Sequence, residues 1–303
     1  MSRVLVTGGS GFIGSHCLEP LVAASFDVHA LATRHDPLAV PGVTWHTVDL
    51  LDPVAAGALV AEIQPTHLLH LAWIVTPGTM IMSPENLHWT QASLGLYRAF
   101  AEAGGTRLVT SGSAYEYDWR FGYCSEAVTP RAPDTVYGSC KRALNDLADA
   151  FAETAGISSA WARIFFLYGP REHPNRLVSS VIRSLLAGTG AKTSHGEQIR
   201  DYLHVQDVAD ALVILLCGEL AGAVNIGSGE PIALKTIVTR IGERIGRPDL
   251  IELGALPARA NDAPLVVADV ARLKGELGWA PAYDLDRGLD QTIEWWRDAG
   301  VEL

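Results

Sequence analysis

The chain has 303 residues, of which 48% are hydrophobic, a composition that excludes a disordered protein and suffices for a large core. Its 34 acidic and 23 basic residues give a net charge of −11, which argues against nucleic-acid binding. The longest apolar run, residues 211–217, is too short to span a membrane, and we expect no signal peptide. The 4 cysteines lack a C-x-x-C pair, so free thiols in a reducing cytoplasm are expected.

The chain begins with a short apolar strand followed by glycines. Residues 4–6 form a buried strand by pattern, and Gly9-Ser10-Gly11-Phe12-Ile13-Gly14 fits G-x-G-x-x-G. Glycines permit a tight turn and let backbone N–H groups approach a pyrophosphate, while the helix start that follows favours an anion. A strand, this motif and a helix in that order predict a dinucleotide site. An ordinary glycine-rich turn is the alternative.

Strands and helices alternate through the first third of the chain. Further strands are predicted at 26–32, 43–48, 67–72 and 107–111, and helices at about 15–24, 53–63 and 84–103. This alternation indicates a parallel sheet covered on both faces. We therefore predict an α/β fold with a doubly wound, Rossmann-type parallel sheet.

The end of the second strand bears on the choice of cofactor. An acidic residue there, roughly 20 positions after the glycines, would bind the ribose 2′-OH of NAD. The chain has Leu31-Ala32-Thr33-Arg34 instead, and the Arg34 guanidinium suits a 2′-phosphate. NADP(H) is therefore favoured, although Asp36 keeps NAD(H) possible and Arg34 could simply be solvated. Asp49, after the third strand, could accept a hydrogen bond from adenine or stabilise a turn.

A tyrosine and a lysine lie four residues apart on a helix predicted at about 136–154. In this Y-x-x-x-K pattern, Tyr137 and Lys141 share one helix face. A nearby cation stabilises a tyrosinate and lowers the tyrosine pKa, so Tyr137 could exchange a proton at a hydroxyl or carbonyl carbon. A surface position for Lys141 is the alternative. Residues 110–117 begin at the end of the fifth predicted strand, at the edge where open parallel sheets carry their sites.

Together these residues resemble the extended short-chain dehydrogenase/reductase family of nucleotide-sugar epimerases, dehydratases and reductases. The resemblance rests on the glycine motif, Ser113, Tyr137 and Lys141. Further matches are Arg163 with 168–170, and residues 200–208, 225–229 and 277–281. They run from Thr7 to Pro281 and so cover essentially the whole chain.

The resemblance implies a role for each matching residue. Tyr137 would be the acid/base, Lys141 would bind the nicotinamide ribose and lower the Tyr137 pKa, and Ser113 would bind the reacting sugar oxygen. Cofactor contacts are expected from Gly8, Ser10, Gly11, Phe12, Ile13, Gly14, Thr33, Arg34, Asp49, Leu50, Leu71, Ala72, Tyr137 and Lys141. Substrate contacts are expected from Trp73, Ser113, Tyr115, Phe166, Arg200 and Arg259. The two arginines would hold the pyrophosphate, or else form surface ion pairs, and no metal site is expected.

Three departures from the family pattern narrow the chemistry. Sugar 4,6-dehydratases usually have Asp and Glu directly after the catalytic Ser/Thr, whereas this chain has Ala114 and Tyr115. The resemblance therefore implies that the elimination lacks its acid and base. Phe166 replaces a common Asn, which predicts a more apolar sugar pocket. The acid that NAD-retaining epimerases usually carry after the second strand is absent.

The second half of the chain is expected to form a smaller lobe. Residues 1–165 would make the dinucleotide-binding domain, with about 204–217 packing back on it, and 166–303 would mainly make the substrate-binding lobe. Helices are predicted at about 177–187, 207–217, 231–246 and 284–298. The last carries Trp295 and Trp296, which we expect to serve packing.

These features predict a cytoplasmic enzyme that reduces a keto group on a nucleotide-linked deoxysugar with NADPH, with Tyr137 as proton donor. A nucleotide-sugar 4-epimerase that retains NAD(P) is the main alternative. A non-sugar alcohol dehydrogenase and a non-catalytic dinucleotide-binding protein are further alternatives.

The resemblance also implies a homodimer built from helices 84–103 and 136–154, with neither nucleic acid nor membrane as partner. Two apolar stripes fit this expectation, although both could instead face the sheet. They comprise Leu87, Leu94, Tyr97 and Phe100 on the first helix, and Leu144, Leu147 and Phe151 on the second.

Overall fold

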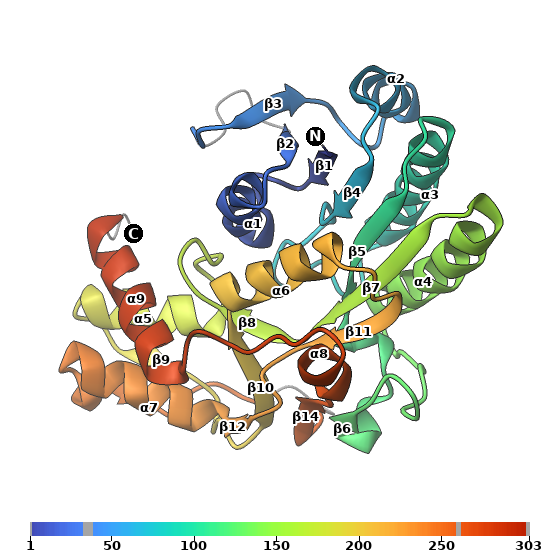
Figure 1. Ribbon diagram of the computed structural model, residues 1–303. Coiled ribbons are helices and arrows are strands. Elements are labelled where there is room, and N and C mark those ends of the chain that lie inside the picture. The colour runs from blue at the N-terminus through green and yellow to red at the C-terminus, as the bar shows by residue number, and fades with distance from the viewer. Residues whose placement is uncertain (1, 33–38, 259–261, 301–303) are drawn as a thin grey trace.

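A seven-stranded parallel sheet forms the centre of the molecule (Figure 1). The computed structural model describes residues 2–32, 39–258 and 262–300. The strand order is β3-β2-β1-β4-β5-β7-β11, as expected for a doubly wound Rossmann fold. The strands are β1 (Arg3–Thr7), β2 (Asp27–Ala32), β3 (Val43–Thr47), β4 (His67–His70), β5 (Arg107–Ser113), β7 (Ser158–Ile164) and β11 (Gly222–Ile226).

Helices cover both faces of this sheet, which confirms the predicted fold class. Because side chains alternate along a strand, Val4 and Val6 of β1 face one core and Leu5 faces the other. The first core contains α1 (Phe12–Ala23) and α6 (Val205–Cys217). The second contains α2 (Pro53–Ile63), α3 (Glu85–Glu102) and α4 (Val136–Ala155).

Local sequence signals account for several element boundaries. Asp52 caps α2 by accepting hydrogen bonds from the N–H groups of Val54 and Ala55, and Pro53 occupies the first turn. α4 ends where Gly156 adopts a left-handed φ of 68°. α1 begins at Phe12, earlier than expected, because the helix starts inside the glycine motif.

A second, smaller sheet lies beside the first, and helices α5, α7 and α9 pack against it. Its order is β12-β10-β14-β6, with β8 pairing with β10. The strands are β6 (Tyr123–Cys124), β8 (Phe166–Tyr168), β10 (Ile199–His204), β12 (Pro231–Ala233) and β14 (Leu265–Ala268), and β9 (Ala191–Lys192) pairs separately with β13 (Ile251–Glu252). The helices are α5 (Leu177–Leu186), α7 (Leu234–Ile245), α8 (Ala271–Gly275) and α9 (Leu285–Asp298), with short 3-10 turns at η1 (Ala114–Glu116), η2 (Trp119–Phe121) and η3 (Pro248–Leu250).

The two sheets exchange segments across the expected boundary at residue 165. α6 packs on α1, and β11 completes one edge of the large sheet although it lies late in the chain. In the other direction, β6 belongs to the smaller sheet. The start of the helix expected at 231–246 is also different, because β12 pairs with β10 before α7 begins. β11 and β6 are thus exchanged between the two sheets, whereas α6 lies within residues 204–217, which were expected to pack back on the first domain.

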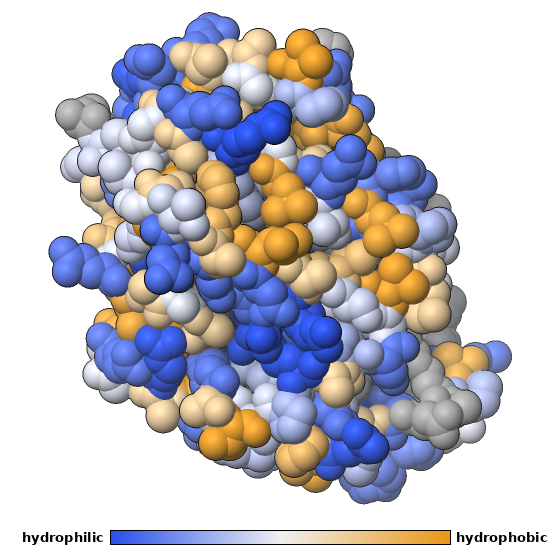
Figure 2. Space-filling view, turned by 90° about the vertical axis from the view of Figure 1, so that its right-hand side faces the viewer, coloured by the Kyte–Doolittle hydropathy of each residue, from blue (hydrophilic) through white to orange (hydrophobic). Residues whose placement is uncertain are grey.

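The apolar stripes on α3 and α4 divide between core and surface. Tyr97, Phe100 and Leu144 are buried against the large sheet. Leu87 and Leu147 keep 61% and 49% of their surface exposed. Figure 2 views the side on which α3 and α4 lie in Figure 1, and its hydrophobic patches are interspersed with hydrophilic ones.

Candidate active site

The glycine loop is held by backbone contacts that a side chain would block. Gly8 has a left-handed φ of 69°, and its carbonyl accepts a 2.9 Å hydrogen bond from the Gly11 N–H. A Cβ on Gly14 would lie 2.1 Å from the Gly8 carbonyl oxygen. Gly11 is the N-cap of α1 and has no side chain to cap it, so the first N–H groups of α1 remain available to an anion.

Thr7 ties the glycine loop to the next strand. Its hydroxyl contacts His70 Nδ1 at 2.7 Å and accepts from the N–H groups of Leu71 and Ala72 at 3.1 and 3.2 Å. His70 Nε2 in turn contacts Ser93 Oγ at 2.8 Å. Burial lowers the pKa of His70 to about 3, so the imidazole is neutral. The predicted cofactor residues Leu71 and Ala72 therefore adjoin the glycine loop.

Asp49 and Leu50, two further expected cofactor residues, follow β3, the edge strand of the sheet. Asp49 Oδ1 accepts a 2.9 Å hydrogen bond from the Leu51 N–H, which is the turn role considered above. Leu50 is buried in the core beneath it. Thr33 and Arg34, on which the NADP(H) expectation depends, lie outside the described residues.

The structure brings the three expected catalytic residues together. Ser113 ends β5, and Tyr137 and Lys141 lie on the first turns of α4. All three are buried, and Tyr137 hydrogen-bonds to Ser113. The Tyr137 N–H donates to the Ile81 carbonyl at 3.0 Å, which joins the start of α4 to the loop before α3.

Lys141 is a buried cation and not a surface residue. Its Nζ donates to the Ser111 carbonyl at 2.8 Å and lies 3.8 Å from the centroid of a Trp73 ring. Burial lowers the pKa of Lys141 to about 7, with Glu116 opposing the shift. Trp73, expected to line the sugar site, is itself buried and donates from Nε1 to Asn86 Oδ1 at 2.8 Å.

The expected lowering of the Tyr137 pKa by Lys141 is corrected by this geometry. Burial raises the pKa of Tyr137 to about 12, although the hydrogen bond with Ser113 opposes the shift. The Lys141 ammonium instead interacts with Ser111 and Trp73. Tyr137 is accordingly neutral at physiological pH, the protonation state that a general acid requires.

Aromatic rings extend from Tyr137 toward Arg200. The rings of Tyr137 and Tyr115 are 5.7 Å apart, and those of Tyr115 and Trp119 are 4.4 Å apart. Phe166 follows at 6.1 Å from Trp119, and the Arg200 guanidinium lies 5.4 Å from the Phe166 ring. Tyr115 and Phe166 thus belong to one run of aromatic contacts that reaches Arg200.

Arg200 is buried and paired. Its Nη2 donates to Asp262 Oδ1 at 2.7 Å, and the side chain is only 4% exposed. The surface ion pair considered above is thus a buried one, in which the Asp262 side chain keeps 21% of its surface exposed. Arg259, the second arginine expected to contact phosphate, lies outside the described residues.

Sequence reasoning did not single out two further features. The first is an open hollow of about 470 Å³ along α1, lined by residues between Ser15 and Ala23 and by Arg171 and Gln206. Arg171 has a left-handed φ of 71°, which is unusual for a residue with a side chain. The other feature is Glu116, a charged residue inside an otherwise buried segment. Among the residues described, no group of three or more His, Cys, Asp and Glu side chains could hold a metal ion.

Known proteins that resemble this chain include nucleotide-sugar enzymes by name. A model of the NAD dependent epimerase/dehydratase family matches residues 4–227. The UDP-glucuronic acid decarboxylase 1 of Xenopus tropicalis is 28% identical over 311 residues, covering 97% of this chain and 72% of that protein. A structure of MoeE5 with UDP-glucose and NAD is 32% identical, with a TM-score of 0.82, and covers 98% of this chain and 99% of that one.

Another solved structure also matches over nearly the whole chain. The UDP-glucose 4-epimerase of Thermus thermophilus, solved with NAD, is 27% identical with a TM-score of 0.86, and the match covers 98% and 100% of the two chains. The fold and site define an enzyme of the extended short-chain dehydrogenase/reductase class. Within that class, the chain belongs to the NAD dependent epimerase/dehydratase family. None of the described helices is long and apolar enough to cross a membrane.

Proposed function

We propose that this enzyme reduces a keto group on a nucleotide-linked deoxysugar, with a nicotinamide cofactor as hydride donor and Tyr137 as proton donor. The observation that carries the proposal is the grouping of Ser113, Tyr137 and Lys141 at the carboxyl end of β5. Ala114 and Tyr115 stand where a dehydratase would need its acid and base. This supports proton and hydride transfer without elimination.

The substrate class is supported by the line of aromatic rings. A sugar beside Tyr137 would lie against Tyr115 and Phe166, and the phosphates would extend toward Arg200. An apolar wall suits a deoxysugar, which presents a methyl group in place of a hydroxymethyl group. Binding of phosphate at Arg200 would require Asp262 to share or release the guanidinium.

The cofactor would bind across the carboxyl ends of β1, β2 and β4. The bound group supplies hydride chemistry; the chain supplies the glycine loop for the pyrophosphate and Lys141 for the nicotinamide ribose. Preference for NADPH rests on Thr33 and Arg34, whereas the solved relatives named above contain NAD. Both cofactors therefore need to be measured.

A nucleotide-sugar 4-epimerase is the second candidate, and it is supported by the epimerase relative from Thermus thermophilus. The two functions use the same residues but differ in redox balance. A reductase given a thymidine-diphosphate 4-keto-6-deoxysugar consumes one NADPH or NADH for each sugar reduced, measured as a loss of nicotinamide absorbance. An epimerase given UDP-glucose forms UDP-galactose without net cofactor consumption. Turnover of neither sugar nucleotide would argue against both candidates.

A further inference from the structure

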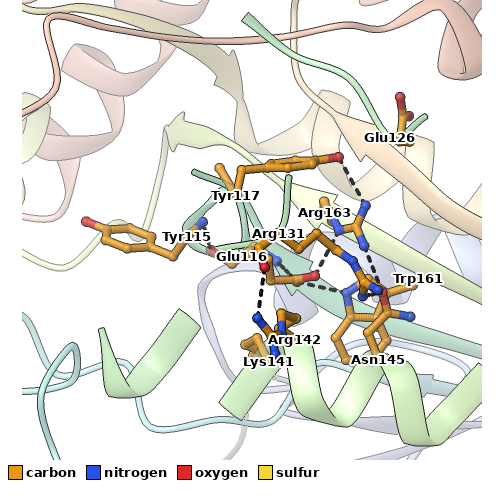
Figure 3. Close-up of polar contacts among 12 residues, drawn as sticks. Tyr115, Glu116, Tyr117, Glu126, Arg131, Lys141, Arg142, Asn145, Trp161 and Arg163 are labelled. Atoms are coloured by element: carbon orange, nitrogen blue, oxygen red, sulfur yellow. Dashed lines mark hydrogen bonds and ion pairs between the residues drawn. The ribbon is translucent and has the colours of Figure 1, made fainter. Parts of the chain in front are cut away.

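A buried carboxylate lies directly behind Ser113. Glu116, at the end of η1, is 0% exposed. Its Oε1 accepts hydrogen bonds from the Ser113 backbone N–H and from Trp161 Nε1, each at 2.8 Å. Figure 3 shows this carboxylate among Arg163, Asn145 and Trp161.

Arg163 holds the second oxygen of this carboxylate. Its Nε donates to Glu116 Oε2 at 2.8 Å, Nη2 donates to Asn145 Oδ1 at 2.8 Å, and Nη1 donates to the Tyr117 hydroxyl at 3.1 Å. A buried ion pair often contributes no more stability than well-packed apolar residues of the same volume. Stability alone therefore does not account for a charge at this position.

Gly112, the residue before Ser113 on β5, leaves room for the hydrogen bond between Trp161 and Glu116. A Cβ on Gly112 would lie 2.1 Å from Trp161 Nε1 and 2.7 Å from Glu116 Oε1. Ser113 itself is extended, with φ −150° and ψ 148°, and its Oγ accepts from the Tyr115 N–H at 3.3 Å. The carboxylate thus restrains the backbone of the residue whose hydroxyl meets Tyr137.

We propose that Glu116 is a positioning residue for this site, fixing Ser113 against Tyr137 and setting the electrostatic field at Lys141. The role in catalysis rests on the proposed function, because it assumes that Ser113 and Tyr137 act on a carbonyl. A displaced Ser113 would leave the reacting oxygen misaligned, and small misplacements cost up to about 100-fold in rate.

Glu116 and Lys141 both bind the end of β5: Lys141 Nζ donates to the Ser111 carbonyl, and Glu116 Oε1 accepts from the Ser113 N–H, each at 2.8 Å. Burial lowers the pKa of the Lys141 ammonium, whereas the Glu116 carboxylate and Cys140 raise it. His70, at the end of β4, and Tyr137, one turn earlier on α4, are further titratable groups near Lys141; burial, and to a lesser extent the Lys141 ammonium, lowers the pKa of His70. Arg163 lies on the far side of Glu116. Removing the carboxylate charge should therefore lower the Lys141 pKa below about 7.

The first test measures lysine titration directly and needs no substrate. The chain has only Lys141, Lys192, Lys235 and Lys274, so isotope-labelled lysine side chains can be followed by NMR across pH. Glu116→Gln should lower the Lys141 midpoint relative to wild type. Tyr117→Phe, which removes another contact of Arg163, should leave the midpoint unchanged. An unchanged midpoint in folded Glu116→Gln would overturn the electrostatic part of the proposal.

The second test separates positioning from binding. With the sugar nucleotide that the redox assay identifies, Glu116→Gln should lower kcat about 10- to 100-fold and leave KM and cofactor Kd within about twofold. Wild-type kcat in this variant would overturn the positioning role, whereas a chain that turns over no sugar nucleotide contradicts the proposed function alone. If Glu116→Gln does not fold, Arg163→Lys keeps the charge pair but loosens its geometry. It should lower kcat without moving the Lys141 midpoint, and an unchanged kcat would again overturn the role.

Discussion

The ammonium of Lys141 lies 3.8 Å from the centroid of a Trp73 ring. Together with the Ser111 carbonyl, this ring gives the buried cation its local partners. These contacts are weaker than a carboxylate partner, so burial dominates and the Lys141 pKa falls to about 7. The charge of this residue therefore changes near neutral pH.

Replacing Lys141 by Met should remove a pH dependence of stability. In the cofactor-free protein the folded pKa of Lys141, about 7, lies below the value of 10.5 for an unperturbed lysine. Between these pH values the unfolded chain binds more protons, so this group makes the free energy of unfolding rise with pH. We expect wild type to gain about 3 kcal/mol relative to Lys141→Met between about pH 6.5 and 9.5. If the free energies of unfolding of the two proteins, measured by urea titration, change in parallel with pH, the lowered pKa of Lys141 would be contradicted.

Tyr137→Phe should abolish proton donation while preserving packing. Cofactor binding should stay nearly unchanged and the rate should fall about 10²- to 10⁴-fold. Ser113→Ala should be milder, and Lys141→Ala should impair both rate and cofactor affinity.

Because the pKa of Tyr137 is about 12, Tyr137 stays protonated across pH 6–9. A loss of cofactor affinity above pH 7 should then report deprotonation of Lys141. Full activity in Tyr137→Phe would instead direct attention to Tyr115.

Arg34→Ala should weaken NADPH binding selectively. A guanidinium stabilises a 2′-phosphate through charge-assisted hydrogen bonds, and NADH lacks that phosphate. We expect a loss of about tenfold or more in NADPH affinity with little change for NADH, measured by fluorescence titration. Equal affinity of the wild type for both cofactors, or tighter NADH, would contradict the NADPH preference.

Glu172→Gln should stabilise the protein above neutral pH. The Glu172 carboxyl is buried and accepts from Ser179 Oγ at 2.6 Å, and burial raises its pKa from 4.5 to about 7. Between these values the folded state keeps a proton that the unfolded state loses, so this group lowers stability as pH rises. The variant should exceed wild type by about 2–3 kcal/mol at pH 8 and by much less at pH 4. A difference that does not depend on pH would contradict the raised pKa.

The exposed leucines on α3 and α4 allow a test of the expected homodimer. Leu87 and Leu147 would be buried in a dimer made from these helices, whereas neither contributes to the buried core of the monomer. The double substitution Leu87→Asp, Leu147→Asp should then yield monomers with little loss of stability, measured by light scattering and thermal unfolding. A monomeric wild type at micromolar concentration would rule the dimer out.

Local signals in the chain suffice for much of this architecture. The glycine motif, the alternation of strands and helices, and the cap at Asp52 depend on neighbouring residues, and each predicts its element directly. The Y-x-x-x-K spacing likewise places Tyr137 and Lys141 on one helix face, because helix periodicity is local. Family resemblance added Ser113, which lies 24 residues before Tyr137.

Tertiary structure alone decided the electrostatics and the long-range pairings. Residue spacing cannot reveal that Lys141 packs against Trp73, that Glu116 pairs with Arg163, or that Arg200 pairs with Asp262. The placement of β11 in the large sheet and of β6 in the small one also depends on contacts distant in sequence. The pKa of a buried group is set by desolvation and by such neighbours. For that reason the sequence identified the tyrosine and the lysine, whereas their protonation depended on the packing around them.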